Sequence, residues 1–144
     1  MKIVICGSVN FTPKIIEISK KLKFLDHKTE IPFTSMKIQS GKLIMEKFLK
    51  EKETNGDDNF RKNQEDLIKR YYNLIKESDA ILVVNINKND IKNYVGGNTF
   101  LELGYAYVLE KPIYLLNDIP DMLYTDEIKA MEPIIINGDL NKII

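Results

Sequence analysis

The sequence is poor in cysteine and histidine, with one of each among 144 residues. The cysteine, Cys6, lies inside an apolar run, and a single thiol cannot form an intramolecular disulfide. The histidine, His27, stands among charged residues between two predicted elements, which favours a solvent-facing turn over a ligand. We therefore expect no metal site, no Ser/His/Asp triad and a reducing, cytoplasmic setting.

The chain also lacks net charge and long apolar runs. Lysine plus arginine total 21 and aspartate plus glutamate total 21, so no net field attracts nucleic acid or an anionic membrane surface. No signal-peptide pattern follows Met1, and no apolar stretch approaches the roughly 20 residues of a membrane span. We expect a soluble protein with a small-molecule partner, and neither a nucleic acid nor a membrane partner.

What the sequence does contain is enough apolar residues, 44%, for one compact domain over residues 1–144. Four runs are continuous and β-branched, as in strands of a parallel sheet that is covered on both faces. A fifth run is more polar and is typical of an edge strand. The four runs cover 2–7, 80–85, 111–117 and 132–137, and the fifth covers 27–33.

Segments of helical periodicity separate these runs. They cover 14–24, 59–76, 99–109, 122–131 and 139–143. The segment 99–109 is almost wholly apolar, which predicts a deeply buried helix. Alternating strands and helices predict right-handed β-α-β units and a three-layer α/β domain.

The segment 36–58 interrupts this alternation. It is rich in lysine, has one short apolar patch, and ends in an Asn-Gly turn signal and an acidic pair. One interpretation is a solvated excursion with one or two helical turns. The other is a mobile lid over a site, because long irregular insertions in compact domains are often functional.

Polar residues follow the predicted strands, at the edge where open parallel sheets bind ligands. Gly7, Ser8 and Asn10 follow the first strand, and Asn117 and Asp118 follow the fourth. The absence of a Cβ at Gly7 would let the backbone approach a ligand. This loop lacks the further glycines of a dinucleotide fingerprint, so the sequence does not predict NAD.

A second glycine loop, Gly96 and Gly97, leads through Asn98 into a predicted helix. It lacks the lysine of a P-loop, but a helix start after two glycines favours an anion. Thr99 as N-cap with Glu102 three residues later fits a capping box, which would contribute on the order of 1 kcal/mol. From these residues alone, capping is favoured over catalysis for Glu102.

Three motifs together resemble the nucleoside 2-deoxyribosyltransferase superfamily, which includes deoxynucleoside 5′-monophosphate N-glycosidases. They are "KIVICGS" at the start, "SDAILVVN", and "GGNTFLELGYAYVLEKPIYLL". The resemblance covers the whole chain in order except the lysine-rich segment 36–58. It implies a flavodoxin-like, Rossmann-like three-layer sandwich with a five-stranded, mainly parallel sheet, no cofactor, and a homodimer or larger assembly.

The same resemblance implies that Glu102 is the nucleophile that attacks C1′ of the deoxyribose. An ionised carboxylate can stabilise the oxocarbenium character at C1′ and then trap the sugar. The start of the helix should lower the pKa of Glu102 and keep it ionised. Residues from the two glycine-bearing loops would surround the sugar or a 5′-phosphate: Ser8, Gly97, Asn98 and Thr99.

The sequence departs from the family at two expected aspartates. Tyr71 occupies one position, in the helix before the third strand, and Gly96 or Gly97 occupies the other. Asp118 or Asp90 could supply an acid instead, and Tyr71 could donate a hydrogen bond to Glu102. Asp79 lies at the amino end of its strand, so we expect a structural role for it.

The sequence therefore predicts cleavage or transfer at the N-glycosidic bond of a nucleoside or its 5′-monophosphate. The missing aspartates keep open a second hypothesis, a non-catalytic nucleotide-binding or sensing domain. A third is a small interaction domain with no ligand. Aromatic and methionine residues on helix faces could form the homodimer contact: Tyr71, Tyr72 and Met131.

Overall fold

Five parallel strands form one central sheet in the order β2-β1-β3-β4-β5. The computed structural model describes residues 1–54 and 58–144. The strands are β1 (Lys2–Cys6), β2 (Lys28–Glu30), β3 (Ala80–Val83), β4 (Ile113–Leu115) and β5 (Ile134–Ile135). This order confirms the flavodoxin-like fold, and it places the polar run β2 at an edge as predicted.

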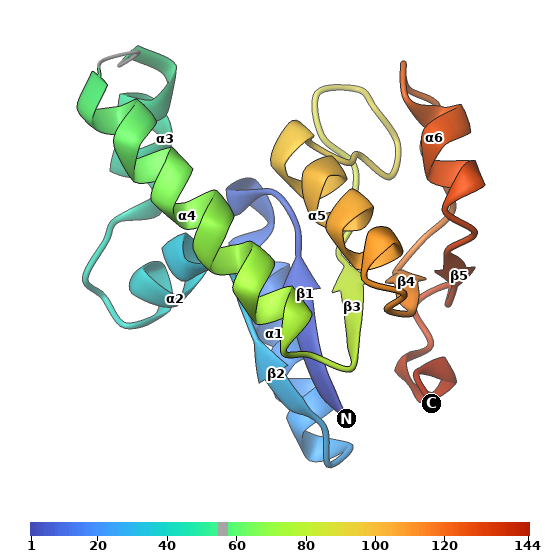
Figure 1. Cartoon of the computed structure of the whole chain (residues 1–144). Helices are drawn as coiled ribbons and strands as arrows, with labels where there is room; N and C mark the ends of the chain where they lie inside the picture. Colours follow the sequence, from blue (N-terminus) through green and yellow to red (C-terminus); the bar gives the residue numbers. More distant parts are fainter. Residues whose placement is uncertain (55–57) are drawn as a thin grey trace.

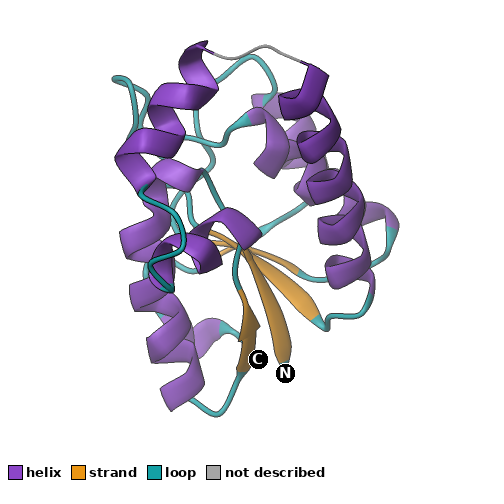
Figure 2. Cartoon of the chain, turned by 90° about the vertical axis from the view of Figure 1, so that its left-hand side faces the viewer, coloured by secondary structure: helices purple, strands orange, loops and turns teal. Residues whose placement is uncertain are grey.

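Helices cover both faces of the sheet (Figures 1 and 2). They are α1 (Thr12–Phe24), α2 (Phe33–Gln39), α3 (Met45–Thr54), α4 (Asp58–Lys76), α5 (Gly97–Val108) and α6 (Thr125–Ala130). Two 3₁₀ turns, η1 (Val9–Phe11) and η2 (Leu140–Lys142), follow β1 and β5. The predicted final helix is therefore a single 3₁₀ turn. Within the described residues, no helix is long and apolar enough to cross a membrane.

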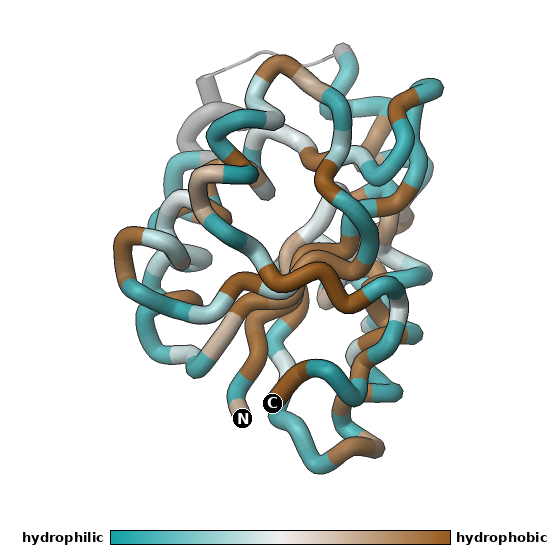
Figure 3. The backbone as a smooth tube through the Cα atoms, turned by 90° about the vertical axis from the view of Figure 1, so that its right-hand side faces the viewer, coloured by the Kyte–Doolittle hydropathy of each residue, from teal (hydrophilic) through white to brown (hydrophobic). Residues whose placement is uncertain are grey.

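The strand alternation divides the core into two layers. Ile3 and Ile5 of β1 pack toward α1 and η2, whereas Val4 and Cys6 pack toward α4, α5 and α6. The buried strands form the apolar centre of the molecule, as the hydropathy colouring in Figure 3 shows. Because Cys6 ends β1 on the α4/α5 side, its side chain lies beneath the loops that follow β1 and β3.

The prediction that the helix around residues 99–109 is deeply buried is wrong. Only Thr99, Leu103 and Ala106 of α5 are buried, because one stripe of the helix reaches the sheet. On the opposite side, Leu101 is 44% exposed and Val108 is 79% exposed. Helix α5 thus presents an apolar face that the described chain does not cover.

The lysine-rich segment contains more regular structure than the sequence predicts. Besides α2, which begins just before it, the segment forms the ten-residue helix α3. The predicted Asn55-Gly56 turn lies outside the described residues. Two of the residues expected at a homodimer contact also differ in exposure, since Tyr72 is 36% exposed whereas Tyr71 is 4% exposed.

Candidate active site

A pocket opens beyond the carboxyl ends of β1 and β3, where the strand order reverses. This is the place where open α/β sheets bind ligands. Six of the eight predicted substrate-binding residues line it, together with Glu102 and Tyr71. The six are Gly7, Ser8, Gly96, Gly97, Asn98 and Thr99.

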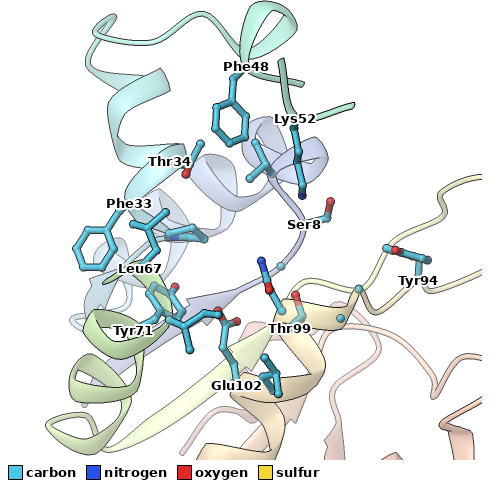
Figure 4. A pocket seen from close by; sticks show the side chains of 18 of the residues that line it. Ser8, Phe33, Thr34, Phe48, Lys52, Leu67, Tyr71, Tyr94, Thr99 and Glu102 are labelled. Atoms are coloured by element: carbon cyan, nitrogen blue, oxygen red, sulfur yellow. The ribbon is translucent and has the colours of Figure 1, made fainter. Parts of the chain in front are cut away.

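Glu102 lies in the second turn of α5 and faces this pocket (Figure 4). Helix α5 begins at Gly97 with Gly96 as its N-cap, and no side chain caps it. The predicted capping box is therefore wrong. The Phe100 amide bonds to the Gly96 carbonyl at 2.8 Å, so the first turn closes before Thr99 could act as N-cap.

The pKa of Glu102 is raised from 4.5 to about 8, because the protein around the carboxyl group displaces water from it, although the residue as a whole is only partly buried. A hydrogen bond from the Cys6 thiol opposes this effect only in part. The prediction that the helix start lowers this pKa is wrong. The helix dipole acts mainly within the first turn, and Glu102 lies beyond it.

Cys6 and Tyr71 lie near Glu102, and its charge acts on the pKa of both. Burial raises the pKa of the Cys6 thiol well above its usual value, and the neighbouring Glu102 carboxylate raises it further. The Tyr71 hydroxyl donates to the Ile5 carbonyl, so its hydrogen-bond partner is the β1 backbone and not Glu102. Burial is also the main cause that raises the pKa of Tyr71. Together β1, α4 and α5 enclose one carboxyl group among groups that remain neutral.

Two predicted binding residues, Asn10 and Asn117, do not line the pocket. The Ser8 hydroxyl donates to the Asn10 side-chain oxygen at 3.1 Å, so Asn10 holds Ser8 in place. Asn117 donates two hydrogen bonds of 2.9 Å to Asn85, one from its backbone amide and one from its side-chain amide, and these bonds join the ends of β3 and β4.

The other predicted acids also lie apart from Glu102. Asp118 is exposed after β4, where its backbone carbonyl accepts a hydrogen bond of 2.9 Å from Asn85. Neither Asp118 nor Asp90 lines the pocket. The Asp79 carboxylate accepts a 2.6 Å hydrogen bond from the Lys2 amide at the opposite edge of the sheet, which agrees with a structural role.

Gly7 lines the pocket, and its position also has a packing reason that was not predicted. A Cβ at Gly7 would lie 3.2 Å from both Ile15 Cδ1 and the Val84 carbonyl oxygen. The glycine therefore allows close packing of the loop against α1 and β3. At Gly97, in contrast, a Cβ would meet nothing within 4 Å, so the start of α5 is open toward the pocket.

Sequence reasoning did not identify several residues of the pocket wall. Phe48 and Lys52 reach it from α3, and Phe33 and Thr34 reach it from the start of α2 (Figure 4). Lys88 and Tyr94 contribute from the β3–α5 loop. Part of the lysine-rich segment thus forms a wall of the pocket. Within the residues described, no three of His, Cys, Asp or Glu are grouped as metal ligands.

Comparisons with known proteins give a similarity to solved structures but none at the level of sequence families. No protein-family model and no curated protein sequence matches the chain. A solved structure of a 2-deoxyribosyltransferase from Bacillus psychrosaccharolyticus is similar to this one, with a TM-score of 0.48 and 19% sequence identity. The similarity covers 80% of this chain and 71% of that chain.

Proposed function

We propose that this chain cleaves or transfers the N-glycosidic bond of a nucleoside or its 5′-monophosphate, with Glu102 as the nucleophile. The observation that supports this most directly is the position of Glu102, a single carboxyl group in the pocket at the strand-order switch point. The aromatic side chains of Phe33 and Tyr105 line the same pocket and offer apolar surface to a base.

In the proposed reaction the ionised Glu102 carboxylate attacks C1′ of the sugar. The C1′–N bond breaks, its electron pair leaves with the base, and the base takes up a proton from water. The product is a glycosyl ester of Glu102. Water or a second base then attacks C1′ and releases the carboxylate, which gives hydrolysis or transfer respectively.

The attack requires Glu102 without its proton. With a pKa of about 8, only about a tenth of the free protein holds the carboxylate at pH 7. The hydrogen bond from Cys6 favours the ionised form, so Cys6 assists the nucleophile in this proposal. Cys6 is a positioning residue because it acts through Glu102.

The decisive experiment is chromatography of purified protein incubated with deoxynucleosides and their 5′-monophosphates, with and without an acceptor base. Free base without acceptor indicates a hydrolase, and exchange only with acceptor indicates a transferase. Glu102→Gln should reduce either rate by on the order of 10³-fold or more. Undiminished cleavage by a correctly folded Glu102→Gln variant would exclude the nucleophile assignment.

One observation favours a second candidate, a non-catalytic nucleotide-binding or sensing domain. Among the described residues that line the pocket, Glu102 is the single carboxylate, and Asp118 lies elsewhere. No second acid is therefore at hand to protonate the leaving base. This candidate predicts that nucleotides raise the melting temperature while no free base appears at any pH.

We further propose that the chain forms a homodimer through the apolar face of α5. Leu101 and Tyr105 on this face also line the pocket, so a partner subunit would lie next to it. The Tyr105 ring packs edge-on against Tyr72 of α4, with ring centroids 5.4 Å apart. This pair extends the apolar face across two helices.

A further inference from the structure

Two lysines from distant segments line the end of the pocket that bears Ser8. Lys52 belongs to α3 and Lys88 to the β3–α5 loop. The Lys88 ammonium lies 3.5 Å from the Ser8 hydroxyl and 4.9 Å from the centroid of the Tyr94 ring. Figure 4 shows Lys52 pointing from α3 toward Ser8, with Glu102 at the other end of the group of labelled side chains.

The charges of these lysines are not balanced by neighbouring acids. Among the ion pairs of the described residues, none includes Lys52 or Lys88. Lys88 is partly buried, and its pKa is lowered by this burial first and by the charge of Lys52 second. Lys52 is exposed, so the cost of this burial falls on Lys88 alone. An anion close to both ammonium groups would offset the repulsion between them and the cost of burying Lys88.

Additional donors line the same pocket. Helix α5 has 12 residues, and its first amides have no partner within the helix. Gly96 and Gly97 line the pocket at this helix start, where the open space around Gly97 leaves room for a ligand. Amides at a helix start bind anions, and here they lie in the same pocket as the two ammonium groups.

We propose that Lys52, Lys88 and the start of α5 form a phosphate-binding subsite, so that the pocket takes a nucleoside 5′-monophosphate in preference to the free nucleoside. A phosphate monoester suits it because the dianion offers several acceptor oxygens to donors on different sides. The nucleoside part of the ligand rests on the proposed function, whereas the anion site does not. In this pose C5′ points to the lysines and C1′ to Glu102.

The test is a binding measurement with the Glu102→Gln variant, which prevents turnover of bound ligand. Calorimetry would compare 2′-deoxynucleosides, their 5′-monophosphates and inorganic phosphate. We expect the monophosphate to bind at least about tenfold more tightly than the nucleoside, since charge-assisted hydrogen bonds distinguish them. The further changes Lys52→Ala and Lys88→Ala should together abolish this preference and leave nucleoside affinity within about twofold.

The matched controls are Lys47→Ala on α3 and Lys92→Ala on the β3–α5 loop. Both lysines are exposed and neither lines the pocket, so both variants should keep the preference. Inorganic phosphate should compete with the monophosphate in the control variants but not after loss of Lys52 and Lys88.

Equal affinity for nucleoside and monophosphate would overturn the phosphate subsite, and so would a preference that survives the double lysine change. Failure of all three ligands to bind would also overturn it. A preference for the monophosphate without base release by the unmodified protein would reject the proposed reaction and support the subsite. Base release by the unmodified protein without any preference for the monophosphate would support the proposed reaction and reject the phosphate subsite.

Discussion

The Cys6 thiol at the end of β1 and the Glu102 carboxyl group in the second turn of α5 act on each other's ionisation: the carboxylate raises the pKa of the thiol, and the thiol lowers the pKa of the carboxyl group. The pKa of Cys6 is raised well above its usual value, so the thiol keeps its proton while Glu102 titrates. Cys6 therefore remains a donor at every pH at which Glu102 changes charge. The pair gives the pocket one acid whose ionisation is controlled by burial and by a single neutral donor.

The rate of base release should depend on the ionisation of Glu102. Because its pKa is about 8, the nucleophilic form is scarce at pH 6 and predominates above pH 8. We expect kcat/KM to rise about tenfold per pH unit below pH 8 and then level off. The measurement should use a nucleoside without phosphate, whose own charge does not change over this range. A profile that is flat between pH 6 and 8 would contradict the prediction.

The stability of the protein should also depend on this group. The pKa of Glu102 is raised in the folded state, so the folded chain holds a proton that the unfolded chain releases. The resulting stabilisation is present below the unfolded pKa of about 4.5 and is lost as the pH rises through about 8. Glu102→Gln should therefore gain melting temperature relative to the unmodified protein between pH 5 and 8.5. Exposed Glu77→Gln, as a control, should show no comparable gain.

Cys6→Ala should move the activity profile to higher pH. Its thiol hydrogen bond lowers the pKa of Glu102, so removal of that bond raises this pKa. We expect a loss of about fivefold in rate at pH 7, which corresponds to one ordinary hydrogen bond, and recovery at high pH. Cys6→Ser retains a donor and should keep the midpoint close to that of the unmodified protein. An equal loss at every pH would indicate a packing defect instead.

Tyr71→Phe separates a structural from a catalytic role for the tyrosine. Its hydroxyl donates to the Ile5 carbonyl in a buried setting, so the change should cost about 1 kcal/mol of stability. For a chain of this length the melting temperature should fall by roughly 3 °C. The rate of base release should stay within about threefold of the original. A hundredfold loss of rate with little change in melting temperature would assign Tyr71 a catalytic role.

Val108→Asp tests the proposed homodimer. Val108 is 79% exposed on the apolar face of α5, and it does not line the pocket. A charge placed there should convert a dimer to a monomer in light scattering coupled to size-exclusion chromatography. Phe24→Asp, at another exposed apolar residue on α1, is the matched control and should leave the assembly unchanged. A monomeric unmodified protein at all concentrations would reject the dimer.

The sheet and the general position of the pocket could be predicted because their signals are local. Runs of β-branched residues indicated the strands, and the rule for open parallel sheets indicated the loops after β1 and β3. The predicted helix 14–24 agrees with α1 to within two residues at its start. Each of these predictions depends on residues that are neighbours in the sequence.

The features that sequence reasoning predicted wrongly or missed depend mainly on contacts between distant segments. The pKa of Glu102 reflects burial against β1, which no pattern around residue 102 records. Lys52 and Lys88 are far apart in the chain, and only the fold brings them to one pocket. The capping box failed for a local reason, because a Thr-x-x-Glu spacing also occurs one turn inside a helix that begins at a glycine.

The two sides of the pocket come from different segments of the sequence. One side of the pocket belongs to the strands and helices that form the core, and it carries Glu102, Cys6 and Tyr71. The other side carries Phe48 and Lys52, which belong to the segment between β2 and β3. Substitutions at Phe48 or Lys52 should therefore change the wall of the pocket while Glu102 and the core remain unchanged.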